Sequence, residues 1–339
     1  MAMKKRIIPM FVAVLLLLSS CTTVGLVEEA SVKTGLSIIA DFTSSKDATA
    51  DADGLAQINV TFTGVTLDAD GKIVKCVIDM SQAKITFDTT GKITSDLTAE
   101  VKTKNELGED YGMKAQSGIG KEWNEQAAAF ADYCVGKTAE EVGSIAVGED
   151  GYATDADILA GTTVHVGNLI AGVVAACANA QDLGASASDT LGIATDIDLA
   201  GRSKDAADDA DGTGYSYAYY TAITLNADGQ ITSSVLNAAQ FQVTFSKEGV
   251  ITTDLTAPQY DKQQLGDSYG MKAKSGIGKE WNEEANAFAE YVKGKTAAEV
   301  SAVAVDEEGH ATDADILAST TVSIAHFQKV IEKAAATAK

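Results

Sequence analysis

The chain has 339 residues, and its balance of 45% hydrophobic and 22% charged residues is typical of a globular protein with room for two domains. Its formal net charge is −22, and no basic patch offsets the acidic residues, which argues against a protein that binds the phosphate backbone of nucleic acids. A strongly acidic exterior keeps a crowded surface protein soluble and disfavours tight adhesion to anionic lipid.

The start of the chain carries a processing signal. Three cationic residues at positions 4–6 precede an apolar run at positions 7–18, which is too short to span a bilayer comfortably. The run ends in Leu18-Ser19-Ser20-Cys21, a pattern that resembles a bacterial lipobox. We therefore expect a lipoprotein signal peptide over residues 1–20 and a lipidated tether over residues 21–32, with Cys21 as the lipid anchor. An ordinary signal peptide followed by an incidental cysteine is the alternative.

An internal repeat organises the rest of the chain. The run Leu107–Met113 reappears 158 positions later as Leu265–Met271, and residues 107–163 match residues 265–321 without a gap at 41 of 57 positions. The segments before these runs match more loosely, so we expect the function in the second half of each copy. A period this long indicates two tandem domains rather than a solenoid. The expected ranges are 33–180 for the first domain, 181–190 for the linker and 191–339 for the second domain.

The first half of each copy is expected to form strands. Residues 58–65 alternate in polarity, as in a strand of an antiparallel sheet. Asp70-Gly71 and Asp228-Gly229 predict two-residue hairpin turns between β-rich runs. A further strand pair is expected around residues 84–87 and Ile93.

The second half of each copy is expected to be helical. Trp123, Ala127, Phe130 and Cys134 follow one another at the spacing of a single helix face, and the second copy repeats this stripe from Trp281. A second helix is expected from about Val164 to Ala178. Strands followed by helices indicate an α+β fold, in which each domain packs an antiparallel sheet against C-terminal helices.

The second copy is an internal control on candidate chemistry, because no histidine or cysteine stands at the same place in both copies. A shared transition-metal site and a cysteine or histidine nucleophile are therefore excluded, and we predict neither a metal nor catalytic residues. The cysteines are interpreted as small core residues, with a Cys134–Cys177 disulfide as the alternative. The aspartate-rich stretches 47–54 and 205–212 lack the spacing of a calcium-binding EF-hand and are expected to be solvated loops. The cysteines and their counterparts are Cys76 and Ser234, Cys134 and Val292, and Cys177 and Ala335.

One polar constellation is present in both copies, at residues 154–164 and 312–322. Each run ends in Thr-Thr-Val, where we expect the last helix of its domain to begin. Thr163 and Thr321 would ordinarily serve there as N-caps. A helix N-terminus also offers free amides and a positive dipole end, which can hold a phosphate beside an accessible hydroxyl.

The constellation resembles the flavinylation motif of FMN-binding domains, which occur in the flavin-bearing subunits of sodium-pumping quinone oxidoreductases and Rnf complexes. The lipobox, the duplication and the run from Tyr111 to Trp123 are similar to two-domain flavinylated lipoproteins of extracellular electron transfer, the pheromone-precursor lipoprotein type. This resemblance covers essentially the whole mature chain. It implies two covalent FMN groups, esterified to Thr163 and Thr321.

The resemblance also implies the other residues of the site. Asp157 and Asp315 match the aspartate of the motif, while Ala160 and Ala318 depart from its common Ser or Thr. The threonine next to each acceptor leaves open which hydroxyl is modified. Three residues of each copy either pack against the isoalloxazine ring or belong to an aromatic core. The further cofactor-binding candidates are Gly161, Thr162, Tyr111, Met113 and Trp123 in the first copy, and Ser319, Thr320, Tyr269, Met271 and Trp281 in the second.

The family implies an electron carrier without its own substrate turnover. A separate flavin transferase would move FMN from FAD to each threonine. The protein would then relay electrons from a membrane donor to an extracellular acceptor or reductase, on the extracytoplasmic face of the cell envelope. The main alternative is a non-redox ligand-binding or adhesive surface lipoprotein, in which the threonines are helix caps.

Overall fold

The computed structural model describes residues 30–339 and has an α+β architecture, as expected from the sequence. The signal peptide, most of the tether and Cys21 lie outside the described residues. No helix within residues 30–339 has the length and hydrophobicity to cross a membrane.

Two antiparallel sheets form the centre of the molecule. The first has the strand order β3-β2-β1-β4 and the second the order β5-β6-β7. The strands of the first sheet are β1 (Ser31–Asp41), β2 (Gly54–Leu67), β3 (Ile73–Phe87) and β4 (Gln181–Ser186). Those of the second are β5 (Thr190–Asp198), β6 (Gly212–Leu225) and β7 (Ile231–Phe245).

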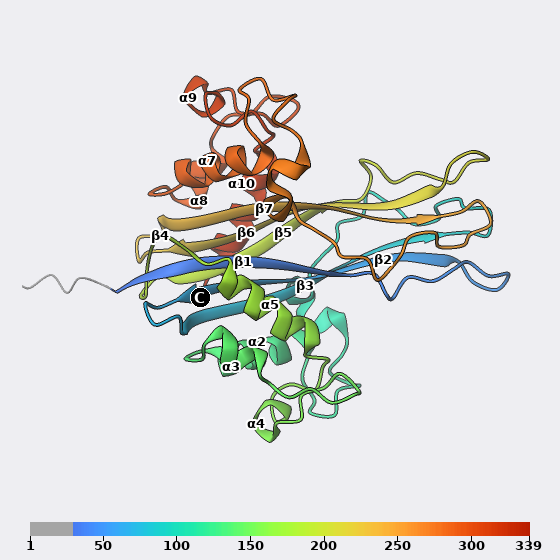
Figure 1. The fold of residues 1–339 in the computed structure, drawn as a ribbon, viewed down its shortest axis with the longest axis horizontal. Coiled ribbons are helices and arrows are strands. Elements are labelled where there is room, and N and C mark those ends of the chain that lie inside the picture. Colours follow the sequence, from blue (N-terminus) through green and yellow to red (C-terminus); the bar gives the residue numbers. More distant parts are fainter. Residues whose placement is uncertain (1–29) are drawn as a thin grey trace, which may run out of the picture.

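Helices cover the outer face of each sheet, which gives four layers in the order helix, sheet, sheet, helix (Figure 1). The first repeat contributes α1 (Lys104–Leu107), η1 (Gly108–Tyr111), α2 (Trp123–Cys134), α3 (Ala139–Gly143), α4 (Ala156–Leu159) and α5 (Gly167–Ala178). The second contributes α6 (Lys262–Leu265), η2 (Gly266–Tyr269), α7 (Trp281–Tyr291), α8 (Ala297–Ser301), α9 (Ala314–Leu317) and α10 (Ala325–Thr337).

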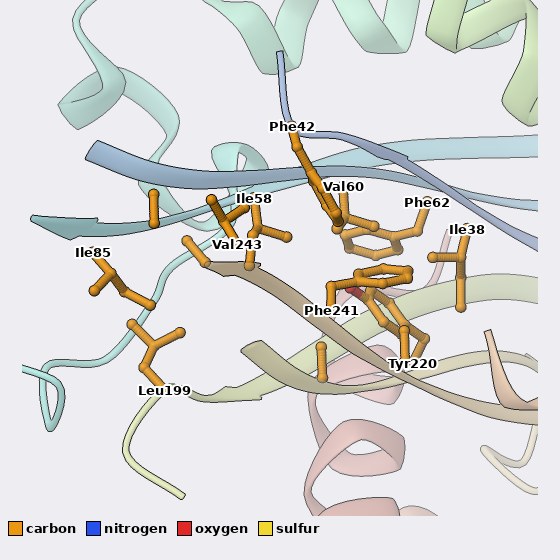
Figure 2. Packing of buried hydrophobic residues seen from close by; sticks show 14 of the residues in the cluster. Ile38, Phe42, Ile58, Val60, Phe62, Ile85, Leu199, Tyr220, Phe241 and Val243 are labelled. Carbon is orange, nitrogen blue, oxygen red and sulfur yellow. The ribbon is translucent and has the colours of Figure 1, made fainter. Parts of the chain in front are cut away.

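The two repeats share one hydrophobic core between the sheets. Phe42 and Phe62 of the first repeat meet Tyr220 and Phe241 of the second in this layer (Figure 2). Separate cores join each sheet to its own helices, around Trp123 and Phe130 in the first repeat and around their counterparts in the second. Each sheet is therefore buried on both faces.

The aspartate-rich loops tie the two repeats together. The Ala48 amide donates to the Gly249 carbonyl at 2.8 Å, and the Ala206 amide donates to the Gly91 carbonyl at the same distance. Asp205 and Asp47 likewise each accept a backbone N–H from the other repeat, from Ile93 and Ile251. Apart from these contacts the loops are solvated, as expected: both stretches are exposed except at Ala48, Gly54, Ala206 and Gly212.

Several expected elements differ in detail from the structure. The expected hairpins are present, but each turn is longer than two residues: the chain reverses over residues 68–72, with Gly71 at φ +76°. Ile93 forms only an isolated bridge with Phe87. The expected linker at 181–190 contains β4, which pairs with β1, so an ordered strand and a tight turn join the repeats. Cys134 and Cys177 are free, so the structure has no disulfide between them.

Candidate functional site

A cavity of about 620 Å³ lies in the first repeat between the outer face of the sheet and the loops that surround α2 and α5. Tyr111, Met113, Trp123 and Thr163 all line it. These four residues come from distant parts of the first repeat, and the fold brings them to one place. Trp123 is also buried in the helix–sheet core, so it serves both the core and the cavity wall.

The loop that carries Met113 is held by a buried glutamate. Both carboxylate oxygens of Glu122 accept backbone N–H groups, from Met113 and Lys114, at 2.9 Å. Glu280 repeats these bonds in the second repeat with Met271 and Lys272. The Glu-Trp pair at the start of α2 and α7 therefore fixes the loop in both copies, which accounts for the near identity of this run.

Thr163 does not cap a helix. Helix α5 begins at Gly167, and its N-cap residue, Val166, makes no side-chain cap. Thr163 lies in the preceding loop, where its amide and its hydroxyl both donate to Oε1 of Gln126, at 2.7 and 3.1 Å. The expectation of an N-cap threonine beside free amides was therefore wrong, since the cap lies three residues later and the Thr163 amide has a partner.

The acceptor position in the second repeat differs by one charge. Glu284 replaces Gln126, and its Oε2 atom accepts the Thr321 amide at 2.6 Å, the Thr321 hydroxyl at 2.9 Å and the Val322 amide at 3.0 Å. Glu284 is fully buried. The two acceptor hydroxyls thus have the same position but different neighbours, a neutral amide in one repeat and a carboxyl group in the other.

The two adjacent threonines have different environments. Thr162 and Thr320 are buried, and their hydroxyls donate to the backbone carbonyls of Gln126 and Glu284 at 2.9 and 3.0 Å. Thr163 and its counterpart are half-buried. The geometry therefore favours the second threonine of each pair as the accessible hydroxyl.

The other candidate residues of the two motifs lie outside the lining of the first-repeat cavity. Asp157 and Asp315 are exposed on the short helices α4 and α9, away from the lining of the cavity. At Gly161, an added Cβ would lie 3.0 Å from Ala129 Cβ, so the glycine allows the loop to approach α2 closely. In the second repeat the Ser319 hydroxyl donates to the Ile316 carbonyl of the preceding helix α9 at 3.2 Å.

A buried lysine at the same place in both repeats was missed by the sequence analysis. Lys104 is the first residue of α1, is 6% exposed and lines the cavity. Its Nζ lies 4.6 Å from the Tyr111 ring centroid and 4.7 Å from that of Trp123. Lys262 makes the equivalent contacts with Tyr269 and Trp281, at 4.5 and 4.8 Å. The retention of a lysine at both positions was the available signal, although the flanking sequence matches poorly.

Burial lowers the pKa of both ammonium groups. The pKa of Lys104 falls to about 8, chiefly because of burial and then because Lys84 is near. The pKa of Lys262 falls to about 7, again chiefly through burial and then through Arg202.

The second repeat has aromatic rings at the corresponding positions. Tyr217, Tyr219 and His326 stand where the first repeat has Asn59, Thr61 and Asn168. The Tyr219 ring stacks on His326, with centroids 4.5 Å apart and planes 6° apart, and on Tyr217 at 4.6 Å. Polar side chains therefore line this part of the first site, whereas stacked rings stand at the same positions in the second.

The first-repeat cavity fits a flavin in size and in chemistry. Its volume is in the range of small-molecule sites. Trp123 and Tyr111 supply aromatic surface, while Asn59, Gln82 and Lys104 supply polar groups for a ring edge. A hydroxyl that could carry a phosphoryl group, on Thr163, is part of the lining.

One group of potential metal ligands occurs within residues 30–339. Carboxylate oxygens of Asp306 and Glu308 and a ring nitrogen of His310 lie within 4.8 Å of one another on the surface of the second repeat. Gly148 and Tyr152 stand at two of these positions in the first repeat, so the group is not shared.

Comparison with known proteins gives one short match. A stretch of 39 residues is 59% identical to a chlorophenol reductase of Desulfitobacterium hafniense, and it covers 12% of this chain and 12% of that protein. No protein-family model matches the chain. No solved structure matches it either.

Proposed function

We propose that the protein is an electron carrier of the cell envelope, anchored by a lipid on Cys21, with one FMN esterified to Thr163 and one to Thr321. The observation that carries this proposal is the meeting of Thr163 with Tyr111, Met113 and Trp123 at one cavity. The reductase name of the partial match is compatible with a redox role.

Each residue at the cavity of the first repeat has a defined role in holding the flavin. The Thr163 hydroxyl is the attachment point and is oriented by Gln126. Trp123 and Tyr111 provide flat apolar surface beside the cavity, and Lys104 provides a cation. FMN itself supplies the electron chemistry, so the protein contributes binding, orientation and electrostatics.

Flavin attachment and electron supply come from other proteins. A separate flavin transferase would take FMN from FAD, and a membrane donor would reduce the bound flavin. An extracellular acceptor or reductase would then oxidise it.

The test is reversible reduction of the purified lipoprotein after co-expression with a flavin transferase. We expect a flavin absorption band that survives denaturation, bleaches with a chemical reductant and returns in air. Thr163→Ser retains a hydroxyl and should keep the first flavin, whereas Thr163→Ala should lose it. A colourless protein from transferase-positive cells would contradict the proposal and favour a non-redox ligand-binding or adhesive lipoprotein.

A further inference from the structure

Lys104 is a buried cation that has no hydrogen-bond acceptor. Its side chain is 6% exposed, and among residues 30–339 no oxygen accepts a hydrogen bond from its Nζ, although two aromatic rings flank it. An ammonium has three N–H donors, and none of those on Lys104, which lines the cavity, has an acceptor in the described protein. The cavity therefore presents an unsatisfied positive group to any molecule that enters it.

Its counterpart, Lys262, already has one hydrogen-bond acceptor. The Lys262 ammonium donates to the Tyr217 hydroxyl at 2.6 Å and contacts the rings of Tyr217, Tyr269 and Trp281. The first repeat has Asn59 at the Tyr217 position.

Asn59 does not replace this acceptor. Its Oδ1 atom accepts hydrogen bonds from Gln57 and Gln82, at 2.8 and 3.1 Å. The difference between the two lysines is therefore built into the strands β2 and β6, which carry these residues.

The charges around the two lysines also differ. Asp79 favours the charged form of Lys104, which partly offsets the effect of Lys84, whereas the charge near Lys262 is the cationic Arg202. With a pKa of about 8, Lys104 is mostly charged at neutral pH, while Lys262, with a pKa of about 7, is only partly charged.

We infer that Lys104 binds the electron-rich edge of the flavin in the first repeat and gives that flavin a higher midpoint potential than the flavin of the second repeat. The inference rests on the proposed function. Reduction places additional negative charge on the isoalloxazine ring, and a cation with no other partner stabilises the reduced ring more than the oxidised one. Lys262 already donates a hydrogen bond to the Tyr217 hydroxyl and stabilises its flavin less.

The consequence is a direction for electrons within the protein. Two flavins of unequal potential hold electrons unequally, and a partly reduced protein keeps its electrons on the first repeat. Electrons that reach the second repeat then pass to the first.

The experiment uses full-length proteins that carry one flavin each. Thr321→Ala retains the first flavin and Thr163→Ala retains the second, and spectroelectrochemical titration gives the potential of each. The first flavin should titrate at the higher potential. In the Thr321→Ala protein, Lys104→Met should lower the ratio of reduced to oxidised flavin at a fixed potential by tenfold or more, which is about 30 mV for a two-electron couple.

Matched variants separate charge from packing. Lys104→Arg keeps the positive charge, so the midpoint potential of the first flavin should stay close to its original value. Lys262→Met in the Thr163→Ala protein should shift the midpoint potential of its flavin less than Lys104→Met shifts that of the first flavin. Lys104→Met should fold, because it removes an unpaired buried charge. Equal potentials for the two single-flavin proteins, or an unchanged potential after Lys104→Met, would overturn the inference while leaving the flavin assignment intact. Intact mass reads attachment separately, and a protein without any FMN adduct would overturn both.

Discussion

Phe87 and Phe245 occupy the same position in the two repeats and stack face to face, with ring centroids 3.9 Å apart and planes 2° apart. The contact lies beside the paired backbone bonds that join Ala48 to Gly249 and Ala206 to Gly91. Each repeat thus completes the core of the other.

The shared core predicts that neither repeat is a stable monomer alone. The first repeat, produced as residues 30–189, would expose the apolar inner face of its sheet, including Phe42, Phe62 and Phe87. Exposed apolar patches of this kind drive association. We expect this fragment to dimerise or aggregate in gel filtration, and mixing it with residues 190–339 should restore a one-to-one complex. A monomeric fragment that unfolds cooperatively would contradict the shared core.

The buried carboxyl group of Asp79 should make the stability of the folded protein depend on pH. Asp79 is 5% exposed, and burial raises its pKa from 3.8 to about 7, although its Oδ1 atom accepts the amides of Met80 and Asn105. Between these two pKa values the folded state holds a proton that the unfolded state has released. The contribution of Asp79 to stability therefore decreases as pH rises from about 4 to about 7 and remains unfavourable above that range.

Asp79→Asn should remove this decrease and raise the free energy of unfolding at pH 8 by up to a few kcal/mol, since one pKa unit corresponds to about 1.4 kcal/mol. The second repeat provides the control, because Asn237 stands at the same place and accepts the Ala238 amide at 2.8 Å. Asn237→Asp should introduce a second pH-dependent loss. Urea unfolding at pH 4.5 and pH 8 measures both variants. Parallel pH dependence in the wild type and in Asp79→Asn would refute the prediction.

The buried carboxylate of Glu284 should stabilise the loop that carries Thr321. This carboxylate accepts two backbone amides and the hydroxyls of Ser275 and Thr321. Glu284→Ala leaves these donors unsatisfied and should cost about 1–3 kcal/mol or more, measured by urea unfolding. Glu284→Gln recreates the first repeat and should cost much less. Equal losses in the two variants would show that the hydrogen bonds do not hold the loop.

The lipobox interpretation predicts that a lipid on Cys21 retains the protein at the membrane. Cys21→Ser removes the thiol that would receive the lipid and should leave the protein unprocessed or released. Membrane fractionation with a mass measurement of the N-terminus checks this outcome. Mature Cys21→Ser protein that still sediments with membranes would contradict the lipobox interpretation.

Local patterns were sufficient for much of the fold. The stripe from Trp123 to Cys134 predicted α2 because its residues face one sheet, and the Asp-Gly pairs predicted the hairpins. The shared core was not predictable in this way. All residues from Ala56 to Leu67 in β2 are buried, since helices cover one face and the other repeat covers the opposite face. Alternation within one strand carries no information about a second sheet.

The candidate site was predictable only where a motif marked it. Thr163 and the Tyr111–Trp123 run were identified from the repeat, and they meet at the cavity. Lys104 was missed because α1 has only four residues, too few for a periodic pattern. The cap of α5 was misplaced because Val166, which has no capping side chain, precedes the helix.

The most direct test of the central claim is the intact mass of the mature protein after co-expression with a flavin transferase. The account predicts two FMN adducts in the wild type, one in Thr163→Ala, one in Thr321→Ala and none in the double variant. Thr162→Val and Thr320→Val are the controls and should keep both adducts, because these buried hydroxyls bond only to carbonyls. A wild-type protein without an adduct, or a double variant that retains two, would contradict the claim.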